Sequence, residues 1–364
     1  MSFDDRSNRQ CIYCHNFCKF CCPSFNATKD HKILETNKNY LFYLFQKKAT
    51  ELKQADGRSF YLCNDCRRCE QFCWDDGKQV MENNRAAKAA ALKEGVAPRP
   101  VYDIKDNLEK YGNFFGQKPG NPPADREREY DVYLYAGEYA QNFEPELIRQ
   151  FGGLLDSMGF SYIYDPSEVS SGVLARDLGA EELSSKLMKQ NYEKIEKYNF
   201  KQLVALAPED YYAFSCEYEK EGLKWGQKVL HYTQFLADNL DRVKTVSSEP
   251  VKYMYFDPCK LGRYCGLYDQ PRAVLKKLLG SEGVEFFRNR EQASCCGGYI
   301  RLLDEQVAGN MAGQIINECR ASGCGFLVTS CPLCLSNLKA ANGSHPLQIV
   351  DIIEVASSSV TGKT

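Results

Sequence analysis

The sequence lacks several features that would place it in a common functional class. No apolar run approaches the length of a membrane span, and the first ten residues, MSFDDRSNRQ, hold no basic, apolar signal region. No Walker loop or dinucleotide glycine fingerprint is present, and the 4 histidines show no metal-ligand spacing. The net charge of −2 gives no reason to expect nucleic acid as a partner. We therefore expect a cytoplasmic protein that binds neither nucleotide nor flavin by itself, without direct membrane insertion.

Cysteine is the residue present in excess, with 18 in 364 residues. Without a secretory signal, reduced and metal-bound thiols are expected rather than a disulfide framework. Cys63, Cys66, Cys69 and Cys73 follow the C-x2-C-x2-C-x3-C spacing with which bacterial ferredoxins hold a 4Fe–4S cluster. A zinc site needs only paired C-x2-C knuckles and leaves the last two cysteines unexplained. The spacing predicts an electron-carrying protein.

A second cysteine group precedes this one. Cys11, Cys14, Cys18 and Cys22 form C-x2-C-x3-C-x3-C followed by Pro23, a ferredoxin motif with one extra residue between its second and third ligands. Crossed ligation then predicts two 4Fe–4S clusters. Their ligand sets are Cys11, Cys14, Cys18 and Cys73 for one, and Cys63, Cys66, Cys69 and Cys22 for the other. Cys21 is left over, and we interpret it as a small buried thiol.

A rival interpretation starts from Cys14, Cys18 and Cys21, whose C-x3-C-x2-C spacing resembles the radical S-adenosylmethionine signature. That class needs a run of strand–helix repeats next, whereas residues 31–60 are helical and charged in pattern. The ferredoxin interpretation is therefore preferred. Lys19, Arg67 and Arg68 lie between ligands, where they would either stabilise a reduced cluster and steer an acidic partner, or form a solvated basic rim.

Helix and strand patterns change along the chain. The stretch after Cys73 favours a helix that ends at glycine, and the prolines and glycines of residues 97–129 predict a linker or arm. From residue 131, apolar runs alternate with helical stretches, which predicts α/β layering with a largely parallel sheet. The expected strands are 132–136, 160–164, 202–206, 251–256, 284–287 and 326–329. The expected helices are 143–158, 174–198, 271–280, 303–321 and 332–341.

Five cysteines follow strands in the last third of the chain. They are Cys259, Cys295, Cys296, Cys331 and Cys334. Loops at the carboxyl ends of parallel strands meet at one edge of the sheet, so these thiols are expected to gather there. Gly297 and Gly298 would allow close backbone approach. Because adjacent cysteines rarely both bind one zinc ion, the pattern favours a multinuclear iron–sulfur cluster, cubane or non-cubane.

Residues 255–338 resemble the CCG domain of the heterodisulfide reductase family, which includes cluster subunits of anaerobic glycerol-3-phosphate dehydrogenase and of glycolate and lactate oxidases. The matching segments are Asp257-Pro258-Cys259, Leu261-Gly262-Arg263, Pro271-Arg272-Ala273-Val274-Leu275, Arg288-Asn289-Arg290, Cys295-Cys296-Gly297 and Cys331-Pro332-Leu333-Cys334. The extra residue between Cys14 and Cys18 resembles a narrower branch that includes benzoyl-CoA reductase electron-transfer subunits. In the heterodisulfide reductases, such five-cysteine sites hold a non-cubane iron–sulfur cluster that cleaves a disulfide. The resemblance implies that the five cysteines here could hold a cluster of this kind.

The resemblance implies two tandem CCG repeats, and the first one departs from the pattern. Aligned strand ends place Glu138 on Cys259, Ser170-Ser171-Gly172 on Cys295-Cys296-Gly297, and Ala207-Pro208-Glu209-Asp210 on Cys331-Pro332-Leu333-Cys334. Serine and carboxylate oxygens are poor substitutes for thiolates toward iron–sulfur clusters, and Cys216 alone cannot hold one. The first repeat is therefore expected to be structural or a docking surface. Cys265, Cys319 and Cys324 are interpreted as small packing residues.

The expected fold is α+β. It comprises a helical two-cluster ferredoxin-like domain (1–96), a linker or arm (97–130), a degenerate CCG repeat (131–250) and a CCG repeat with a cluster (251–364). The expected function is electron transfer within a multi-subunit oxidoreductase of anaerobic metabolism, between a ferredoxin-like or flavin subunit and a catalytic subunit. The alternatives are a disulfide or thiol reductase acting at the CCG cluster, and a zinc-bound scaffold, which the ferredoxin spacing disfavours.

Overall fold

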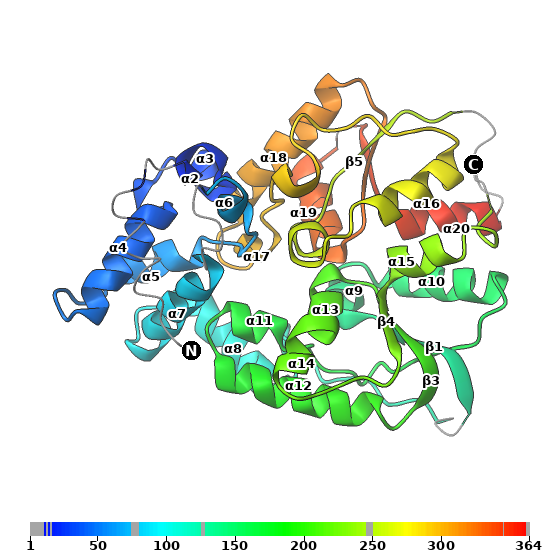
Figure 1. Ribbon diagram of the computed structural model, residues 1–364, viewed down its shortest axis with the longest axis horizontal. Helices are drawn as coiled ribbons and strands as arrows, with labels where there is room; N and C mark the ends of the chain where they lie inside the picture. The colour runs from blue at the N-terminus through cyan, green and yellow to red at the C-terminus, as the bar shows by residue number, and fades with distance from the viewer. Residues whose placement is uncertain are drawn as a thin grey trace.

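The computed structural model describes residues 11, 14, 17–73, 80–124, 128–244, 250–344 and 346–361. Its N-terminal segment is helical and lies beside two sheet-containing units (Figure 1). Its helices are α2 (Cys18–Cys21), α3 (Pro23–Thr28), the 3-10 helix η1 (His31–Ile33), α4 (Glu35–Gln46), α5 (Gln54–Tyr61), α6 (Arg68–Gln71) and α7 (Val80–Lys93). The predicted helix after Cys73 is thus present from Val80, and residues 74–79 of that prediction lie outside the described residues.

The segment predicted as a linker or arm contains a helix, which its many prolines did not suggest. Helix α8 (Arg99–Tyr111) begins after Pro98 and carries Pro100 in its first turn, where a missing N–H removes no helical hydrogen bond. Val101, Ile104 and Leu108 form its buried face. The arm is therefore a packed element over part of its length rather than an extended connection.

The first sheet is parallel, with strand order β2-β1-β3-β4. Its strands are β1 (Glu129–Tyr135), β2 (Tyr162–Tyr164), β3 (Asn199–Ala205) and β4 (Lys228–His231). The helices of this unit are α9 (Gly137–Phe143), α10 (Pro145–Ser157), α11 (Val173–Asp177), α12 (Glu181–Ile195), α13 (Pro208–Tyr212), the π-helix η2 (Ala213–Glu217), α14 (Tyr218–Lys220) and α15 (Tyr232–Asp238). β1 and β3 are buried along most of their length, as strands covered by helices on both faces are.

The second sheet is parallel too, with strand order β5-β6-β7, and Val284 pairs with Met254 of β5 as an isolated bridge. Its strands are β5 (Tyr253–Tyr255), β6 (Phe326–Thr329) and β7 (Gln348–Asp351). Its helices are the π-helix η3 (Lys260–Tyr264), α16 (Asp269–Leu279), the 3-10 helix η4 (Arg290–Gln292), α17 (Gly298–Arg301), α18 (Glu305–Ala321), α19 (Pro332–Asn342) and α20 (Ile352–Thr361). With Val284 in the place of β2, the two sheets share one strand order.

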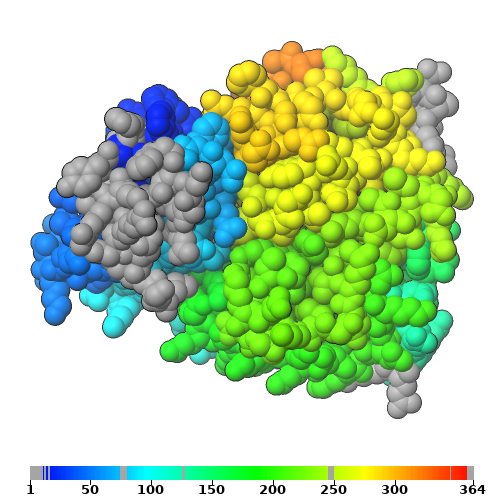
Figure 2. Space-filling model, viewed as in Figure 1, coloured from blue at the N-terminus to red at the C-terminus, as the bar shows by residue number. Residues whose placement is uncertain are grey.

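The two units pack through helices, with α10 against α20 and α15 against α16. The N-terminal segment contacts the second unit through α3 on α18 and through α6 on η4. In the space-filling view this segment (blue) meets residues of the second unit (yellow) along a continuous seam (Figure 2). One hydrophobic cluster at that contact includes Ile33, Cys66, Cys295 and Met311.

The expected α+β class with parallel strands is confirmed, but one strand prediction is wrong and two strands were missed. Residues 284–287 form no strand, because only Val284 pairs, while Phe286 turns inward onto Phe256. The edge strands β4 and β7 were missed, since each has four residues and little apolar sequence. Among the described helices none is long and apolar enough to cross a membrane.

Candidate metal centres

Five thiols line one small cavity in the N-terminal segment. They belong to Cys11, Cys14, Cys18, Cys69 and Cys73. Glu35 and Phe72 complete part of the wall. The structure thus brings Cys73 to the three cysteines with which crossed ligation was predicted to group it. Thiolates are the donors that iron–sulfur clusters use, so this donor set fits a cluster.

The second predicted group also comes together. Cys22 interacts electrostatically with Cys66, and Cys69 interacts with both Cys63 and Cys66. Cys69 therefore adjoins both groups. The leftover thiol of Cys21 is fully buried and points at the backbone carbonyls of Cys18, at 3.5 Å, and Arg68, at 3.9 Å. This agrees with its interpretation as a packing residue.

A buried lysine places positive charge at the second group. Lys38 on α4 is 2% exposed and pairs with Glu35 at 2.6 Å. Burial alone would lower the pKa of Lys38, but Cys63 and Glu35 beside it raise the pKa above the ordinary value. Lys38 therefore stays charged. Burial raises the pKa of Cys63 and of Cys22, and the charge of Lys38 opposes that rise.

The five cysteines of the last third form one continuous line of thiols. Cys259 contacts Cys295, Cys295 contacts Cys296, and Cys331 contacts Cys334. The Sγ atoms of Cys296 and Cys334 are 3.2 Å apart, which joins the two halves of the line. All five follow the carboxyl ends of β5, β6 or the Val284 bridge, as the strand pattern predicted.

Two glycines allow this line to form. Gly297 has φ +90, and a Cβ atom there would approach the Cα atom of Ala308 to 3.2 Å. A Cβ atom on Gly298 would lie 2.5 Å from Cγ of Leu333. Side chains at either position would push the Cys295-Cys296 loop away from α18 and α19, so the predicted need for glycine is confirmed.

The N-terminal thiols and this line meet at one contact. Cys66 and Cys295 are hydrogen-bonded through their side chains, which lowers the pKa of Cys66 and helps to raise that of Cys295. Arg263 lies over this contact, donating from Nε to the carbonyl of Cys66 and from Nη1 to the carbonyl of Ala293 at 2.7 Å. Burial opposes its charge, but Cys66, Cys259 and Cys295 raise the pKa of Arg263. The positive charge of Arg263 thus lies next to both thiol groups.

The cysteine-free positions of the first unit also lie together. Ser170 donates to Glu138 at 2.7 Å, and the side chains of Ser171 and Asp210 are hydrogen-bonded. Glu209 reaches the other unit, where its two carboxylate oxygens lie 3.7 Å from Sγ of Cys331. All five residues are buried. Where the second unit holds thiols, the first therefore holds a hydrogen-bonded oxygen cluster.

This oxygen cluster predicts a pH-dependent stability. Burial raises the pKa of Glu138 from 4.5 to about 7, although Ser170 and the backbone N–H of Phe114 lower it. The stability contributed by Glu138 is complete below about 4.5 and is lost as the pH rises through about 7. Glutamine can accept from Phe114 and donate to the Ser170 hydroxyl. Glu138→Gln is therefore expected to gain up to about 3 kcal/mol over the wild type between pH about 5 and about 8.

Urea denaturation at both pH values checks this expectation. Glu146→Gln is the control, because Glu146 is exposed and, among the described residues, pairs with Arg149 and Gln150 on its own helix. A difference between Glu138→Gln and the wild type that is the same at both pH values would show that Glu138 does not titrate in this range.

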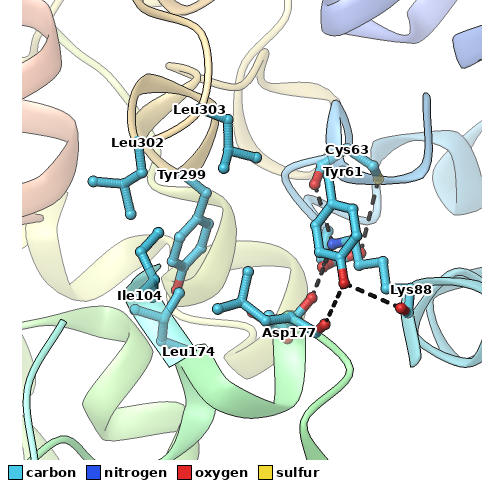
Figure 3. Close-up of a pocket in the computed structure, with 11 residues that line it drawn as sticks. Tyr61, Cys63, Lys88, Ile104, Leu174, Asp177, Tyr299, Leu302 and Leu303 are labelled. Carbon is cyan, nitrogen blue, oxygen red and sulfur yellow. Dashed lines mark hydrogen bonds and ion pairs between the residues drawn. The ribbon is translucent and has the colours of Figure 1, made fainter. Parts of the chain in front are cut away.

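Buried ion pairs join all three parts of the chain, and sequence reasoning missed them. Asp177 on α11 pairs with Arg85 on α7 and with Lys260 on η3, each at 2.7 Å. Lys88, one turn along from Arg85, pairs with Asp65 at 2.6 Å and donates to the carbonyl of Asp177. Figure 3 shows Tyr61, Cys63 and Lys88 on one side of Asp177, and Tyr299 of α17 with Leu302 and Leu303, which follow that helix, on the other. These side chains line a cavity of about 20 Å³. The sign of these ion pairs in the sequence was the i, i+3 spacing of Arg85 and Lys88, which places both side chains on one face of α7.

The remaining predicted residues lie elsewhere. Cys265 sits near Cys216 beside Tyr211 and not among the five thiols, while Cys319 and Cys324 belong to the apolar core, as expected. Lys19 is exposed, as a solvated rim would be. Arg67 lies over the ring of Tyr264 at 3.9 Å, and Arg68 is 3% exposed, so these two arginines are not rim residues.

All 18 cysteines are free thiols. Within the described residues, no three His, Cys, Asp or Glu side chains converge closely enough to hold a single metal ion. The fit to iron–sulfur clusters therefore rests on the donor sets, which are soft thiols in groups of four or five.

Comparison with known proteins gives one family match and several relatives. Residues 253–339 match the cysteine-rich domain called CCG. The probable iron–sulfur-binding oxidoreductase FadF of Bacillus subtilis is 27% identical over 83% of this chain and 46% of its own length. The EtfAB:quinone oxidoreductase of Syntrophomonas wolfei is 29% identical over 80% of this chain and 45% of its own length. The chain thus spans about half the length of these two relatives.

A third relative has nearly the same length. It is a dihydromethanophenazine:CoB–CoM heterodisulfide reductase subunit of Methanosarcina mazei, 24% identical over 96% of this chain and 93% of its own length. Among solved structures, a hypothetical protein from Helicobacter pylori superposes with a TM-score of 0.65 at 11% identity, covering all of this chain and 74% of that one. That likeness shows the fold alone. The resemblance inferred from the cysteine motifs is confirmed: residues 253–339 match the CCG cysteine-rich domain, and the chain is similar to an iron–sulfur-binding oxidoreductase and to a heterodisulfide reductase subunit.

Proposed function

We propose that this chain is an iron–sulfur electron-transfer subunit of a multi-subunit, cytoplasmic oxidoreductase. It would relay electrons between a ferredoxin-like or flavin subunit and a catalytic subunit. The contact between Cys66 and Cys295 carries the proposal, because it joins the N-terminal thiols to the thiol line of the CCG domain. Without that contact the two groups would be separate sites. With it they form one path through the protein.

The proposed ligand sets are those expected from the sequence. They are Cys11, Cys14, Cys18 and Cys73 for the first 4Fe–4S cluster, Cys22, Cys63, Cys66 and Cys69 for the second, and Cys259, Cys295, Cys296, Cys331 and Cys334 for a third, cubane or non-cubane, cluster. When bound, such clusters accept and release single electrons. The chain's own residues hold them at fixed separations and exclude water, since most of these thiols are at least partly buried.

We infer that the two sheet-containing units are tandem repeats, at about residues 131–250 and 251–364. The shared strand order and the equivalent places of Glu138 and Cys259, each after a first strand, support this inference. The first repeat carries no thiol at these positions and serves as structure. The N-terminal segment up to about residue 96 would be the two-cluster domain, with the arm at 97–130 between them.

The names of the relatives support the same role. They include an iron–sulfur-binding oxidoreductase, a quinone oxidoreductase, a probable membrane-anchored ferredoxin and a component of a heterodisulfide reductase. Because the chain spans about half of several of these proteins, their whole activities are not carried over. The narrower resemblance to benzoyl-CoA reductase electron-transfer subunits stays a prediction.

Iron and sulfide content tests the proposal, together with electron paramagnetic resonance on anaerobically purified protein. The wild type is expected to hold about twelve irons, and the Cys295→Ser, Cys296→Ser variant about eight. Ala293→Ser, two residues earlier in the same loop, is the matched control and should keep the wild-type content. A wild type and variant that both hold about eight irons would contradict a third cluster.

The competing function is reduction of a disulfide at the CCG cluster. The name of the heterodisulfide reductase relative favours it, whereas the oxygen cluster in the first unit leaves only one thiol line for such chemistry among the described residues. Thiol-dependent turnover by the isolated chain decides between them. We expect none, and turnover that disappears in the Cys295→Ser, Cys296→Ser variant would replace the electron-transfer proposal.

A further inference from the structure

A cavity of about 280 Å³ opens between the N-terminal segment and the CCG domain. It lies beside Phe256, which follows β5, at the carboxyl end of the sheet where open parallel sheets bind ligands. Its lining residues come from both sides of the seam. They include Asn26 and Arg68 on one side, and Arg288, Ser294 and Gln314 on the other. None of the described lining residues belongs to the three proposed cluster sites.

Two arginines line this cavity. Arg68 is 3% exposed, and its Nη1 donates to the carbonyl of Cys21 at 2.9 Å and to the Ser294 hydroxyl at 3.5 Å. Within the described residues its Nε has no hydrogen-bond partner. Arg288 lies over the ring of Phe72 at 5.6 Å. Among the residues that the structure describes, no carboxylate pairs with either arginine. Burial lowers the pKa of Arg68, the thiols of Cys66 and Cys21 oppose that shift, and the neighbouring charges of Arg263 and Arg288 add to it. An anion between Arg68 and Arg288 would offset the repulsion between these two cations.

The single acidic side chain in the described lining is already engaged. Glu318 on α18 accepts the backbone N–H of Phe287 at 2.7 Å, which fixes the loop that carries Arg288. Because the described lining holds two arginines and this one carboxylate, it carries a net positive charge. Glu318 is therefore not a displaced ion-pair partner of Arg68 or Arg288.

The opposite wall is apolar and aromatic. Phe256 and Phe286 pack edge to face with ring centroids 6.2 Å apart, and Ile315 lies beside them. Phe287 is 89% exposed and lines the same cavity. A small pocket with an apolar wall and two convergent charged groups matches the general make-up of small-molecule sites.

We propose that this cavity binds a small organic anion, with its sulfonate, carboxylate or phosphate group between Arg68 and Arg288 and its apolar body against the phenylalanines. The ligand would contact Ser294, the residue before Cys295. It would therefore sit next to the thiol line without displacing any thiol. This site goes beyond the proposed electron transfer, since it gives the chain a ligand of its own.

Isothermal titration calorimetry on the anaerobically purified full chain tests this site with two matched probes. Benzenesulfonate and benzenesulfonamide have nearly the same shape, but only the first is an anion. Benzenesulfonate is expected to bind at least about tenfold more tightly, because a charge-assisted hydrogen bond contributes about 1.5–3 kcal/mol. Inorganic sulfate should bind more weakly than benzenesulfonate, since it lacks the apolar body. Equal binding of the two aromatic probes, equal or tighter binding of sulfate, or no heat from benzenesulfonate up to about 10 mM would overturn the proposal.

Three variants locate the binding. Arg288→Ala should weaken benzenesulfonate by about 10- to 100-fold. Arg290→Ala is the matched control, because Arg290 is on the same loop but pairs with Asp269 at 2.8 Å and does not line the cavity. Gln314→Trp, on the exposed side of α18, should abolish binding by filling the space while leaving both arginines. Unchanged binding in Arg288→Ala and Gln314→Trp would show that the anion binds elsewhere and would overturn the assignment.

Discussion

Replacing Asp177 with alanine is expected to lower the free energy of unfolding by about 3–5 kcal/mol, the loss typical of a buried charge left without its partner. Arg85 and Lys260 both pair with this carboxylate at 2.7 Å, and all three side chains are at most 5% exposed. Burial alone would raise the pKa of Asp177, but Lys260 and Arg85 lower it to about 2. The alanine variant therefore buries two cations with no carboxylate between them.

Urea denaturation of anaerobically purified protein measures this loss. Asp103→Ala is the control, because Asp103 forms an exposed pair with Arg99 at 2.9 Å on α8 and should lose only about 0.3–0.5 kcal/mol. A second change gives a sharper check. Adding Lys260→Met to Asp177→Ala removes one of the stranded cations and should restore part of the stability. If the double variant is less stable than Asp177→Ala alone, the uncompensated charge is not the cause of the loss.

The position of Asp177 gives this prediction a structural meaning. Arg85 belongs to the N-terminal segment, Asp177 to the first sheet-containing unit and Lys260 to the second. Lys260 directly follows Cys259, and Lys88 donates to the carbonyl of Cys63 at 3.3 Å. The ion pairs therefore fix the separation of the thiol groups. The first unit, which has no thiol at the positions equivalent to the five CCG cysteines, supplies the anion at the centre of this junction.

Sequence reasoning found the thiols but not these charges. The cysteines carry their meaning in their spacing, so Cys63 to Cys73 predicted a site from local sequence alone. Arg85, Lys88 and Lys260 look like ordinary surface residues in a sequence, because Lys and Arg are rarely buried. Their burial results from the packing of three segments that are far apart in the chain. The contact between Cys66 and Cys295, separated by 229 residues (295 − 66), was invisible for the same reason.

The fold shows the same division between local and distant signals. Helix α18 and strand β6 were predicted at or near their observed bounds, since their periodicity is strong. Strand β7 has the sequence QIVD and is defined mainly by pairing with β6, and no local pattern marks it. The segment at 284–287 is the reverse case. Its apolar residues predict a strand, yet Phe286 fills a gap beside Phe256 and only Val284 pairs.

Arg263→Met is expected to lower the reduction potential of the two proposed clusters that lie on either side of the Cys66–Cys295 contact. Arg263 is buried, donates to the carbonyls of Cys66 and Ala293, and interacts with the thiols of Cys66, Cys259 and Cys295. Each added electron is a negative charge, so a fixed cation favours the reduced state. A unit charge at about 7 Å in an effective dielectric of about 20 contributes about 2.4 kcal/mol, which corresponds to about 100 mV for one electron.

Redox titration followed by electron paramagnetic resonance measures this shift in the full chain. Arg263→Lys separates charge from geometry, because lysine keeps the charge but loses the forked hydrogen bonds of the guanidinium. It should recover most of the potential, whereas Arg290→Met, which removes an exposed cation of the CCG domain, should change it little. If Arg263→Met and Arg263→Lys shift the potential equally, the guanidinium acts by holding the Cys66 and Ala293 carbonyls in place. If Arg263→Met shifts neither centre, the cation does not tune the path between them. The predicted order of reduction potentials places Arg263→Met well below Arg263→Lys, and Arg263→Lys near the wild type. This order follows only if one buried charge favours electrons on both sides of the contact.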